Sequence, residues 1–362
     1  MVYADNAATT KMSRTAIDAM LPYMETHYGN PSSLYRLGQE AAEALQSARE
    51  TVAACLGCTP REITFTSGGS EADNQALISA ARIGERKGKK HIISTAFEHH
   101  AILHTLKKLE KEGFEVELLP VGPIGTVTAQ QVADTIRPDT CLVTTMYANN
   151  EIGSILPIAE IGAVCREKGV LFHTDAVQAA GHLHINVNEQ NIDMLSLSGH
   201  KFHGPKGTGV LYARQGIPLT NIIEGGAQER GKRAGTENVP GIMGLAAALK
   251  EACDHIDENA GSDALFLTSD SHLTPVFALA GRRILCGSGS YVYYHGMDYS
   301  AEYNAMRALY ETPDEDTLAA WDIGYAVFDS SVYAKFAADE SWYAARYDVW
   351  YENAACRVYK IK

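Results

Sequence analysis

Strand and helix patterns alternate along the first 250 or so residues, and this alternation limits the possible folds more than any other feature of the chain. Apolar runs rich in β-branched residues, typical of buried strands, lie at 62–66, 91–95, 116–119, 141–146, 170–174 and 194–197. Segments with helical spacing lie at 36–55, 99–112, 129–136, 158–168 and from residue 70 onward. The pattern predicts an α/β fold with a mostly parallel sheet between helices, and a ligand beyond the carboxyl ends of the strands.

The composition changes after about residue 260. Twelve of the 18 tyrosines fall in this last part of the chain. Strand-like segments at 264–267, 283–285 and 325–328 predict a smaller, atypical α/β domain there. We therefore predict a large domain at 1–258 and a small domain at 259–362, with residues 1–14 able to pack on the small one.

Charge and composition exclude several classes of function. A net charge of −13 argues against nonspecific nucleic-acid binding. No apolar run is long enough to span a bilayer, and the first ten residues do not resemble a signal peptide. Seven scattered cysteines favour a reduced, cytoplasmic protein. Cys55 and Cys58 form a CxxC without a second pair, which predicts a helix-to-loop turn and no bound metal.

The segment SLSGHKFHGPKGTG at 196–209 carries the strongest chemical signal. Lys201 follows a predicted strand and precedes a Gly-rich turn, a position from which its amine could form a Schiff base. Ser198 and His200 could bind a phosphate. By itself the segment fits a solvated surface loop equally well.

A second segment, FHTDAVQAAG at 172–181, places an acid at the end of another strand. A buried Asp175 needs a positive partner, which a protonated pyridine nitrogen would supply. Gln178 could donate to a phenolate oxygen of the same ring. The alternative is that Asp175 caps a following helix.

Four further motifs follow predicted strands or lie in loops. TFTSGGSEADN at 64–74 has the strand–turn–helix layout that surrounds a phosphate with backbone N–H groups, and Ser70 with Asp73 also fits a capping box. His99 in EHHA could stack on a cofactor ring. Asn150 in ANNEIG could contact the ring or the substrate, and Thr236 in GKRAGTEN could bind a phosphate. Each has a structural alternative when taken alone.

Together these motifs resemble the cysteine desulfurase family of the class V aminotransferases, which are fold type I pyridoxal-phosphate (PLP) enzymes. DNAATT at 5–10 and YGNPSS at 28–33 complete the set, which appears in the family's order over about residues 1–258. The resemblance implies a PLP transferase fold in which Lys201 binds the cofactor, His99 stacks, Asp175 contacts the pyridine nitrogen and Gln178 the phenolate. It implies phosphate contacts from Gly69, Ser70, Ser198, His200 and, across a homodimer, Thr236, and substrate contacts from Asn30 and Asn150.

The resemblance implies an enzyme that removes sulfur from L-cysteine, giving L-alanine and a protein persulfide for an iron–sulfur scaffold or another acceptor. Two alternatives stay open: a PLP-dependent lyase or aminotransferase, and a PLP-binding protein without turnover. They stay open because residues after about 260 do not match the family, and its SSGSAC-like nucleophile loop is absent. Cys286 in ILCGSGS is our candidate nucleophile, with Cys356 less suited. Arg346 and Arg357 are candidates for binding the substrate carboxylate.

Overall fold

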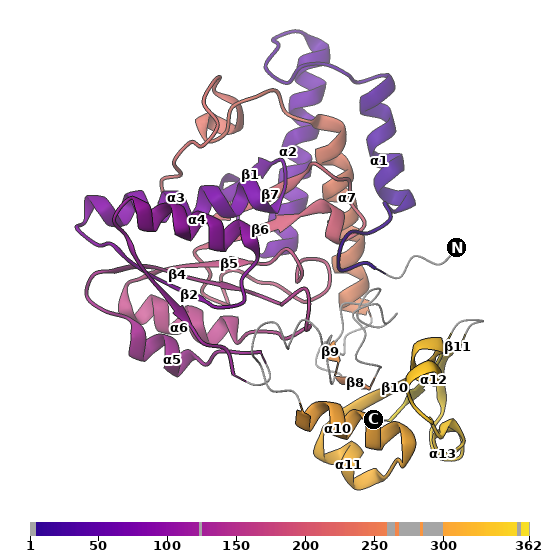
Figure 1. The fold of residues 1–362 in the computed structure, drawn as a ribbon. Coiled ribbons are helices and arrows are strands. Elements are labelled where there is room, and N and C mark those ends of the chain that lie inside the picture. The colour runs from indigo at the N-terminus through magenta and orange to yellow at the C-terminus, as the bar shows by residue number, and fades with distance from the viewer. Residues whose placement is uncertain are drawn as a thin grey trace.

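A seven-stranded sheet organises the larger part of the chain in the computed structural model, which describes residues 5–122, 125–258, 265–267, 283–284, 300–352 and 356–361 (Figure 1). All strands run parallel except β7, which is antiparallel to both of its neighbours. The order across the sheet is β1 (Ile63–Thr66), β7 (Gly209–Ala213), β6 (Met194–Ser198), β5 (Leu171–Asp175), β4 (Thr140–Met146), β2 (His91–Thr95) and β3 (Glu115–Leu119).

The six strands that the sequence predicted in this part are confirmed, and β7 is the strand that it missed. β7 was missed because its short apolar run directly follows the Gly-rich turn after Lys201 and therefore resembles the end of a loop. The helices are α1 (Arg14–Glu25), α2 (Arg36–Leu56), α3 (Gly69–Arg86), α4 (His100–Lys111), α5 (Ala129–Thr135), α6 (Ile158–Lys168) and α7 (Val239–Glu258), with 3₁₀ turns at Pro60–Glu62, Gly199–Lys201 and Gln228–Gly231.

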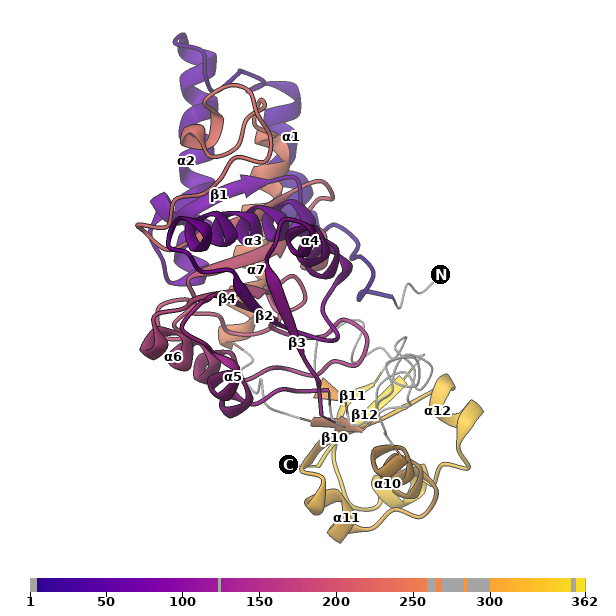
Figure 2. The same ribbon diagram turned by 60° about the vertical axis from the view of Figure 1, so that its left-hand side comes forward.

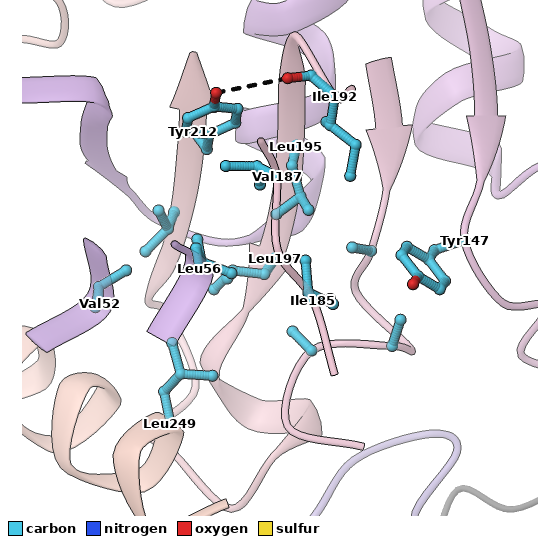
Figure 3. Close-up of a cluster of buried hydrophobic side chains, with 14 of the residues drawn as sticks. Val52, Leu56, Tyr147, Ile185, Val187, Ile192, Leu195, Leu197, Tyr212 and Leu249 are labelled. Atoms are coloured by element: carbon cyan, nitrogen blue, oxygen red, sulfur yellow. Dashed lines mark hydrogen bonds between the residues drawn. The ribbon is translucent and has the colours of Figure 1, made fainter. Parts of the chain in front are cut away.

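Both faces of the sheet are buried, because successive side chains of a strand point to opposite faces and helices cover each face. Ile93 and Val143 belong to one core, and their neighbours Ile92 and Leu142 belong to the other. Figure 3 shows part of the first core, in which Leu195 and Leu197 of β6 lie near side chains of α2 and α7. This packing fixes the strand ends at which the site is built.

The CxxC ends a helix, as the sequence predicted. Gly57 follows α2 in the left-handed region at φ 69°, and its N–H donates to the carbonyl of Ala54. The N–H of Cys58 donates to the carbonyl of Ala53. Paired bonds of this kind satisfy the last carbonyls of a helix. Burial raises the pKa of Cys58 to about 12, so this thiol stays protonated at neutral pH.

The C-terminal residues build a second sheet with its own core (Figure 2). Its order is β11 (Val349–Glu352), β12 (Cys356–Lys360), β10 (Ile323–Asp329), β8 (Leu265–Leu267) and β9 (Arg283–Ile284). Among the described residues, the helices that accompany it are α10 (Ser300–Glu311), α11 (Glu315–Ala320), α12 (Ser330–Lys335) and α13 (Glu340–Ala344). The three predicted strands are confirmed where residues are described, and β11 and β12 were missed. The boundary at 258 stays a prediction.

Aromatic side chains fill this second core. The rings of Tyr310 and Phe336 stack at 5.3 Å, and Phe328 contacts Tyr343 and Tyr359 edge-on at 5.1 and 5.7 Å. The hydroxyl of Tyr310 donates to the carbonyl of Val327, so its polar end is satisfied. In the part of the chain that the structure describes, no helix has the length and apolar character to cross a bilayer.

Candidate active site

A cavity of ≈ 480 Å³ lies at the carboxyl ends of β4, β5 and β6, where an α/β sheet is expected to bind its ligand. It gathers side chains from segments far apart in the sequence. Its lining consists of Asp5, Ala7, Ala8, Gly69, Ser70, Asp73, His99, Met146, Ala148, Asn150, Glu151, Asp175, Val177, Gln178, Ser198, His200 and Lys201.

Lys201 closes the 3₁₀ turn after β6 and directs its amine into this cavity. The amine donates to the carbonyls of Ala7 and, at 3.0 Å, of Ala8. Burial lowers the pKa of Lys201, although Asp175, Asp5 and Glu151 act in the opposite direction. A larger share of this amine is therefore neutral near pH 7 than in a solvated lysine, which favours reaction with a carbonyl group.

The segment at 5–13 is part of this site. The N–H of Thr10 donates to the carbonyl of His200 at 2.8 Å, and the N–H of Ser13 donates to that of His203 at 2.9 Å. The Thr10 hydroxyl accepts the N–H of His203 at 2.7 Å. These contacts hold the described residues of the segment against the Lys201 turn. The packing of residues 1–14 on the C-terminal domain stays a prediction.

Two carboxyl groups and an imidazole meet at the inner end of the cavity. Asp175 ends β5, Asp73 lies in α3 and His99 caps α4. One carboxylate oxygen of each acid and one ring nitrogen of His99 lie within 4.8 Å of one another. Asp175 accepts the N–H of Val177 at 2.9 Å, so it caps a turn rather than the helix considered from the sequence. Burial raises the pKa of Asp175, while Val177, His99 and Lys201 lower it.

Asp73 is 1% exposed. Its pKa is raised well above the ordinary value, mainly by burial and secondly by the charge of Asp175. A third acid, Glu98, lies nearby and accepts the Thr95 hydroxyl at 2.5 Å and the Met146 N–H at 2.9 Å. Burial raises the pKa of Glu98 to about 8. The inner end of the cavity is therefore suited to a cationic ligand group.

The other end of the cavity is suited to a phosphate. α3 begins there, and its first N–H groups with Ser70 border the cavity together with Ser198 and His200. Gly68 precedes the helix at φ 153°, a conformation that a side chain would strain. Burial lowers the pKa of His200 to about 4, so its neutral ring can donate one hydrogen bond and accept another.

The capping box expected from Ser70 and Asp73 is wrong. α3 is capped by Gly68, without a side-chain hydrogen bond, so Ser70 lies inside the first turn. Glu71 supplies the reciprocal contact instead, accepting the N–H of Ser67 at 2.8 Å. Asp73 is one turn further on and faces the cavity, because residues three apart share one side of a helix.

Gln178 and Asn150 border the cavity as expected, though each already has an intramolecular partner. The amide of Gln178 donates to the carbonyl of Ala7 at 3.0 Å, and that of Asn150 donates to Glu151 at 2.6 Å. Both amides would exchange these contacts for a ligand with an oxygen at the same place. Their predicted roles stay predictions.

Thr236 and Asn30 do not line this cavity. Thr236 borders a separate cavity of ≈ 130 Å³ with Ser67 and Thr208. That position agrees with a role across a dimer interface but does not test it. Asn30 accepts the N–H of Ser32 at 2.9 Å in the connection between α1 and α2, and its substrate contact stays a prediction.

Two ion pairs hold the loop that carries Thr236. Arg49 of α2 donates twice to Glu229, at 2.8 and 2.7 Å, and Glu229 also accepts the N–H of Phe65 at 2.9 Å. Arg233 pairs with Glu71 at 2.9 Å. Glu229 has a positive φ of 48°, a conformation that costs free energy, and these bonds hold it there.

The guanidinium candidates do not line the cavity, and the thiol candidates lie outside the described side chains. Cys286 and the side chain of Cys356 lie outside the described residues, and none of the five described cysteines lines the cavity. Cys55 and Cys253 border a different cavity beside α7. Arg357 pairs with Glu340 at 2.8 Å and Arg346 lies 3.7 Å from Glu315, so both are engaged within the C-terminal part.

These residues fit pyridoxal phosphate. The cavity combines an amine of lowered pKa, a helix N-terminus with two neighbouring polar side chains, and buried acids that lack a cation. One oxygen of Asp73 is fully buried without a hydrogen-bond partner among the described residues. A protonated ring nitrogen would supply a positive charge for Asp175 at this end of the cavity.

The sequence analysis missed Asp73, Glu98, Asp5 and Glu151 as members of the site's electrostatics. A signal for Asp73 was present, because it follows Ser70 by three residues on a helix that begins at the phosphate end. Its reading as a capping residue hid that role. Asp5 and Glu151 could not be found from spacing, since folding alone brings them to Lys201.

Known proteins share this architecture. The aminotransferase class-V family profile matches residues 2–263. Cysteine desulfurase IscS of Methanosarcina thermophila is 52% identical over 258 residues, which are 71% of this chain and 64% of that protein. The chain thus spans less than two thirds of the length of this curated relative.

Two solved structures extend the comparison. One, described as SspA in complex with cysteine, is 42% identical with a TM-score of 0.67, covering 69% of this chain and 72% of that one. DndA from Streptomyces lividans is 32% identical with a TM-score of 0.66, covering 99% of both chains. These proteins share the fold type I arrangement of a mostly parallel sheet between helices.

Proposed function

Because this chain belongs to the aminotransferase class-V family, we propose that it is a PLP-dependent cysteine desulfurase, which converts L-cysteine to L-alanine and retains the sulfur as a protein persulfide. The observation that carries the proposal is the position of Lys201. Its amine of lowered pKa lies in one cavity with the phosphate-suited start of α3 and the buried Asp175. The resemblance of the cavity-bearing region to cysteine desulfurases supports L-cysteine as substrate.

Each end of the cavity would hold one part of the cofactor. Lys201 would bind its aldehyde carbon, and Asp175 would pair with the ring nitrogen. The ring would lie against His99, with Gln178 and Asn150 near its oxygen. The phosphate would be bound by Gly69, Ser70, Ser198 and His200, with Thr236 of the partner subunit completing its ligands in a homodimer.

Bound PLP supplies an electron sink that stabilises negative charge at the substrate's α-carbon. The chain contributes the proton transfer. With PLP bound, the Lys201 amine would be the group that takes the proton from the substrate's α-carbon. The carbonyls of Ala7 and Ala8 accept hydrogen bonds from this amine and hold it near one position. Little free energy is then needed to orient the amine for proton transfer.

The sulfur step needs a thiol, and we assign it to Cys286. Its thiolate attacks the substrate sulfur, a new S–S bond forms, and the carbon–sulfur bond breaks. The electron pair stays with the carbon, which takes up a proton and leaves as alanine. One cysteine and one thiol thus become one alanine and one persulfide, so no external oxidant or reductant is needed. The persulfide would pass to an iron–sulfur scaffold or another acceptor.

Release of sulfide and alanine from L-cysteine by the PLP-loaded protein, with a reductant present, tests this proposal. We expect wild type to form both products in equal amounts and Lys201→Ala to form neither. Cys286→Ser should lose sulfide release, whereas Cys253→Ser, which removes a thiol outside the cavity, should keep it. A wild-type protein that binds PLP and releases neither product contradicts the proposal.

A second function within the same family is favoured by one observation, that none of the described cysteines reaches the cavity. A PLP-dependent lyase or aminotransferase needs no protein thiol. Unchanged turnover in Cys286→Ser, or alanine formation from a sulfinate analogue by a protein that does not act on cysteine, would support this alternative.

A further inference from the structure

Three buried carboxyl groups surround the inner end of the cavity. Asp73, Glu98 and Asp175 are each at most 5% exposed. Carboxyl groups buried this close together do not all ionise, because each negative charge opposes the next. The single positive charge of a ring nitrogen can balance one of them, so the identity of the ionised acid determines how the cofactor is held.

Asp175 has the surroundings of the ionised acid. It accepts the N–H of Val177 at 2.9 Å and faces the cationic amine of Lys201 and the imidazole of His99. Glu98 lies further from the cavity, which it does not line. Its two hydrogen bonds, from Thr95 and Met146, fix its orientation.

Asp73 has the surroundings of a neutral acid. The ionisable groups that act on it most strongly are Asp175 from β5 and Glu98 from the turn before α4, and both are acids, so neither supplies a positive charge. Its oxygen Oδ1 has no hydrogen-bond partner among the described residues. Nε2 of His173 lies 3.7 Å from this oxygen. Burial lowers the pKa of His173 to about 3, so this ring is uncharged and provides no counter-charge.

A buried hydrogen-bonded chain holds this acid in place. His173 interacts through Nδ1 with the hydroxyl of Thr144 at 2.9 Å and through Nε2 with that of Ser196 at 3.0 Å. Ser196 in turn hydrogen-bonds with Asp73. The chain links β4, β5 and β6 to α3, and all four side chains are at most 1% exposed.

We propose that Asp73 is a positioning residue: it remains a neutral, proton-bearing acid, anchored through Ser196 and His173, so that Asp175 alone faces the ring nitrogen as a carboxylate. This inference rests on the proposed function, because that function places the ring nitrogen at this end of the cavity. Asp73 acts through Asp175 and not on the substrate.

Two substitutions separate the proton-bearing role from simple packing. Asp73→Asn keeps a neutral group of the same shape with a hydrogen-bond donor, so PLP affinity and the pH midpoint of the cofactor absorbance should stay within about twofold of wild type. Asp73→Leu removes the polar group, leaves Asp175 less well solvated and should weaken PLP binding about tenfold or more, with a shifted midpoint. Ser79→Ala, a buried polar loss in the same helix away from the cavity, is the matched control.

An infrared difference spectrum of wild type against Asp73→Asn reads the protonation state directly. We expect loss of a protonated carboxylic acid band. Loss of an ionised carboxylate band overturns the proposal, as does an Asn variant as impaired as the Leu variant, or a Leu variant whose midpoint does not move. The band is measured whether or not cysteine is turned over, so failure of the desulfurase assignment is distinguished from failure of this inference.

Discussion

The two parts of this protein bury different kinds of side chain. The larger part buries polar groups, among them Asp73, His173 and Ser196, inside an otherwise apolar core. The C-terminal part fills its core with aromatic rings, and the buried hydroxyls of Tyr310 and Tyr343 donate to backbone carbonyls. Buried polar side chains that lack strong partners reduce stability and are kept where chemistry needs them. The contrast places the proposed cofactor site in the larger part.

The chain provides a separate reporter for each part. All three tryptophans, Trp321, Trp342 and Trp350, lie in the C-terminal part, so their fluorescence follows that part alone. The absorbance of bound PLP would follow the larger part. The two signals therefore report on the two parts separately.

Lys201→Ala should have the largest effect. Loss of the group that moves the α-proton is expected to lower turnover by about 10²–10⁴-fold, and the covalent hold on PLP is lost as well. Stopped assays for alanine and the absorbance of the dialysed protein measure the two losses. Lys206→Ala changes an exposed lysine of the same segment and should leave both intact. Equal losses of turnover and bound PLP in both variants would mean that the Lys201 amine has no specific role in this segment.

Arg49→Met should destabilise the larger part by about 3–5 kcal/mol, because it leaves Glu229 as a buried charge without its partner. In urea unfolding, the PLP signal should move to lower concentration while tryptophan fluorescence keeps its midpoint. Arg36→Met removes an exposed ion pair from the same helix and should leave both midpoints close to their wild-type values. A joint shift of both signals would show that the two parts unfold together.

Phe328→Ala tests the other part. Phe328 is 2% exposed and contacts four tyrosine rings, so truncation should cost about 3–5 kcal/mol in the tryptophan transition. The PLP signal should not move. Val349→Ala, at a half-exposed position of β11, is the matched substitution and should change little. Loss of PLP binding in Phe328→Ala would show that the C-terminal core supports the cofactor site.

Glu98→Gln should give the smallest effect, visible as a change in pH dependence. The folded-state pKa of Glu98 is about 8, above the ordinary 4.5, so the folded protein binds the extra proton between these values. Its contribution is therefore fully present below about pH 4.5 and lost as the pH rises through about 8. Urea unfolding from pH 5 to 9 should show a shallower decline for Glu98→Gln than for wild type. Glu117→Gln, half-exposed on β3, should retain the wild-type slope.

The sequence by itself determined the larger sheet and most of its cofactor site. Continuous apolar runs, separated by helical segments, identified β2, β4, β5 and β6, because strands of a parallel sheet are buried on both faces. Polar residues just after those strands had to meet at one edge of the sheet. That geometric necessity brought Asp175, Ser198 and Lys201 into one cavity.

Tertiary structure alone decided which charges act on that cavity. Asp73 was read as a capping residue, and Asp5 and Glu151 had no local signal, because their effect on Lys201 depends on distances across the fold. Arg346 and Arg357 were assigned to the substrate on residue type, and the structure pairs them with nearby acids instead. Periodicity records which face of an element is buried. Which charges meet there depends on how segments from distant parts of the chain pack.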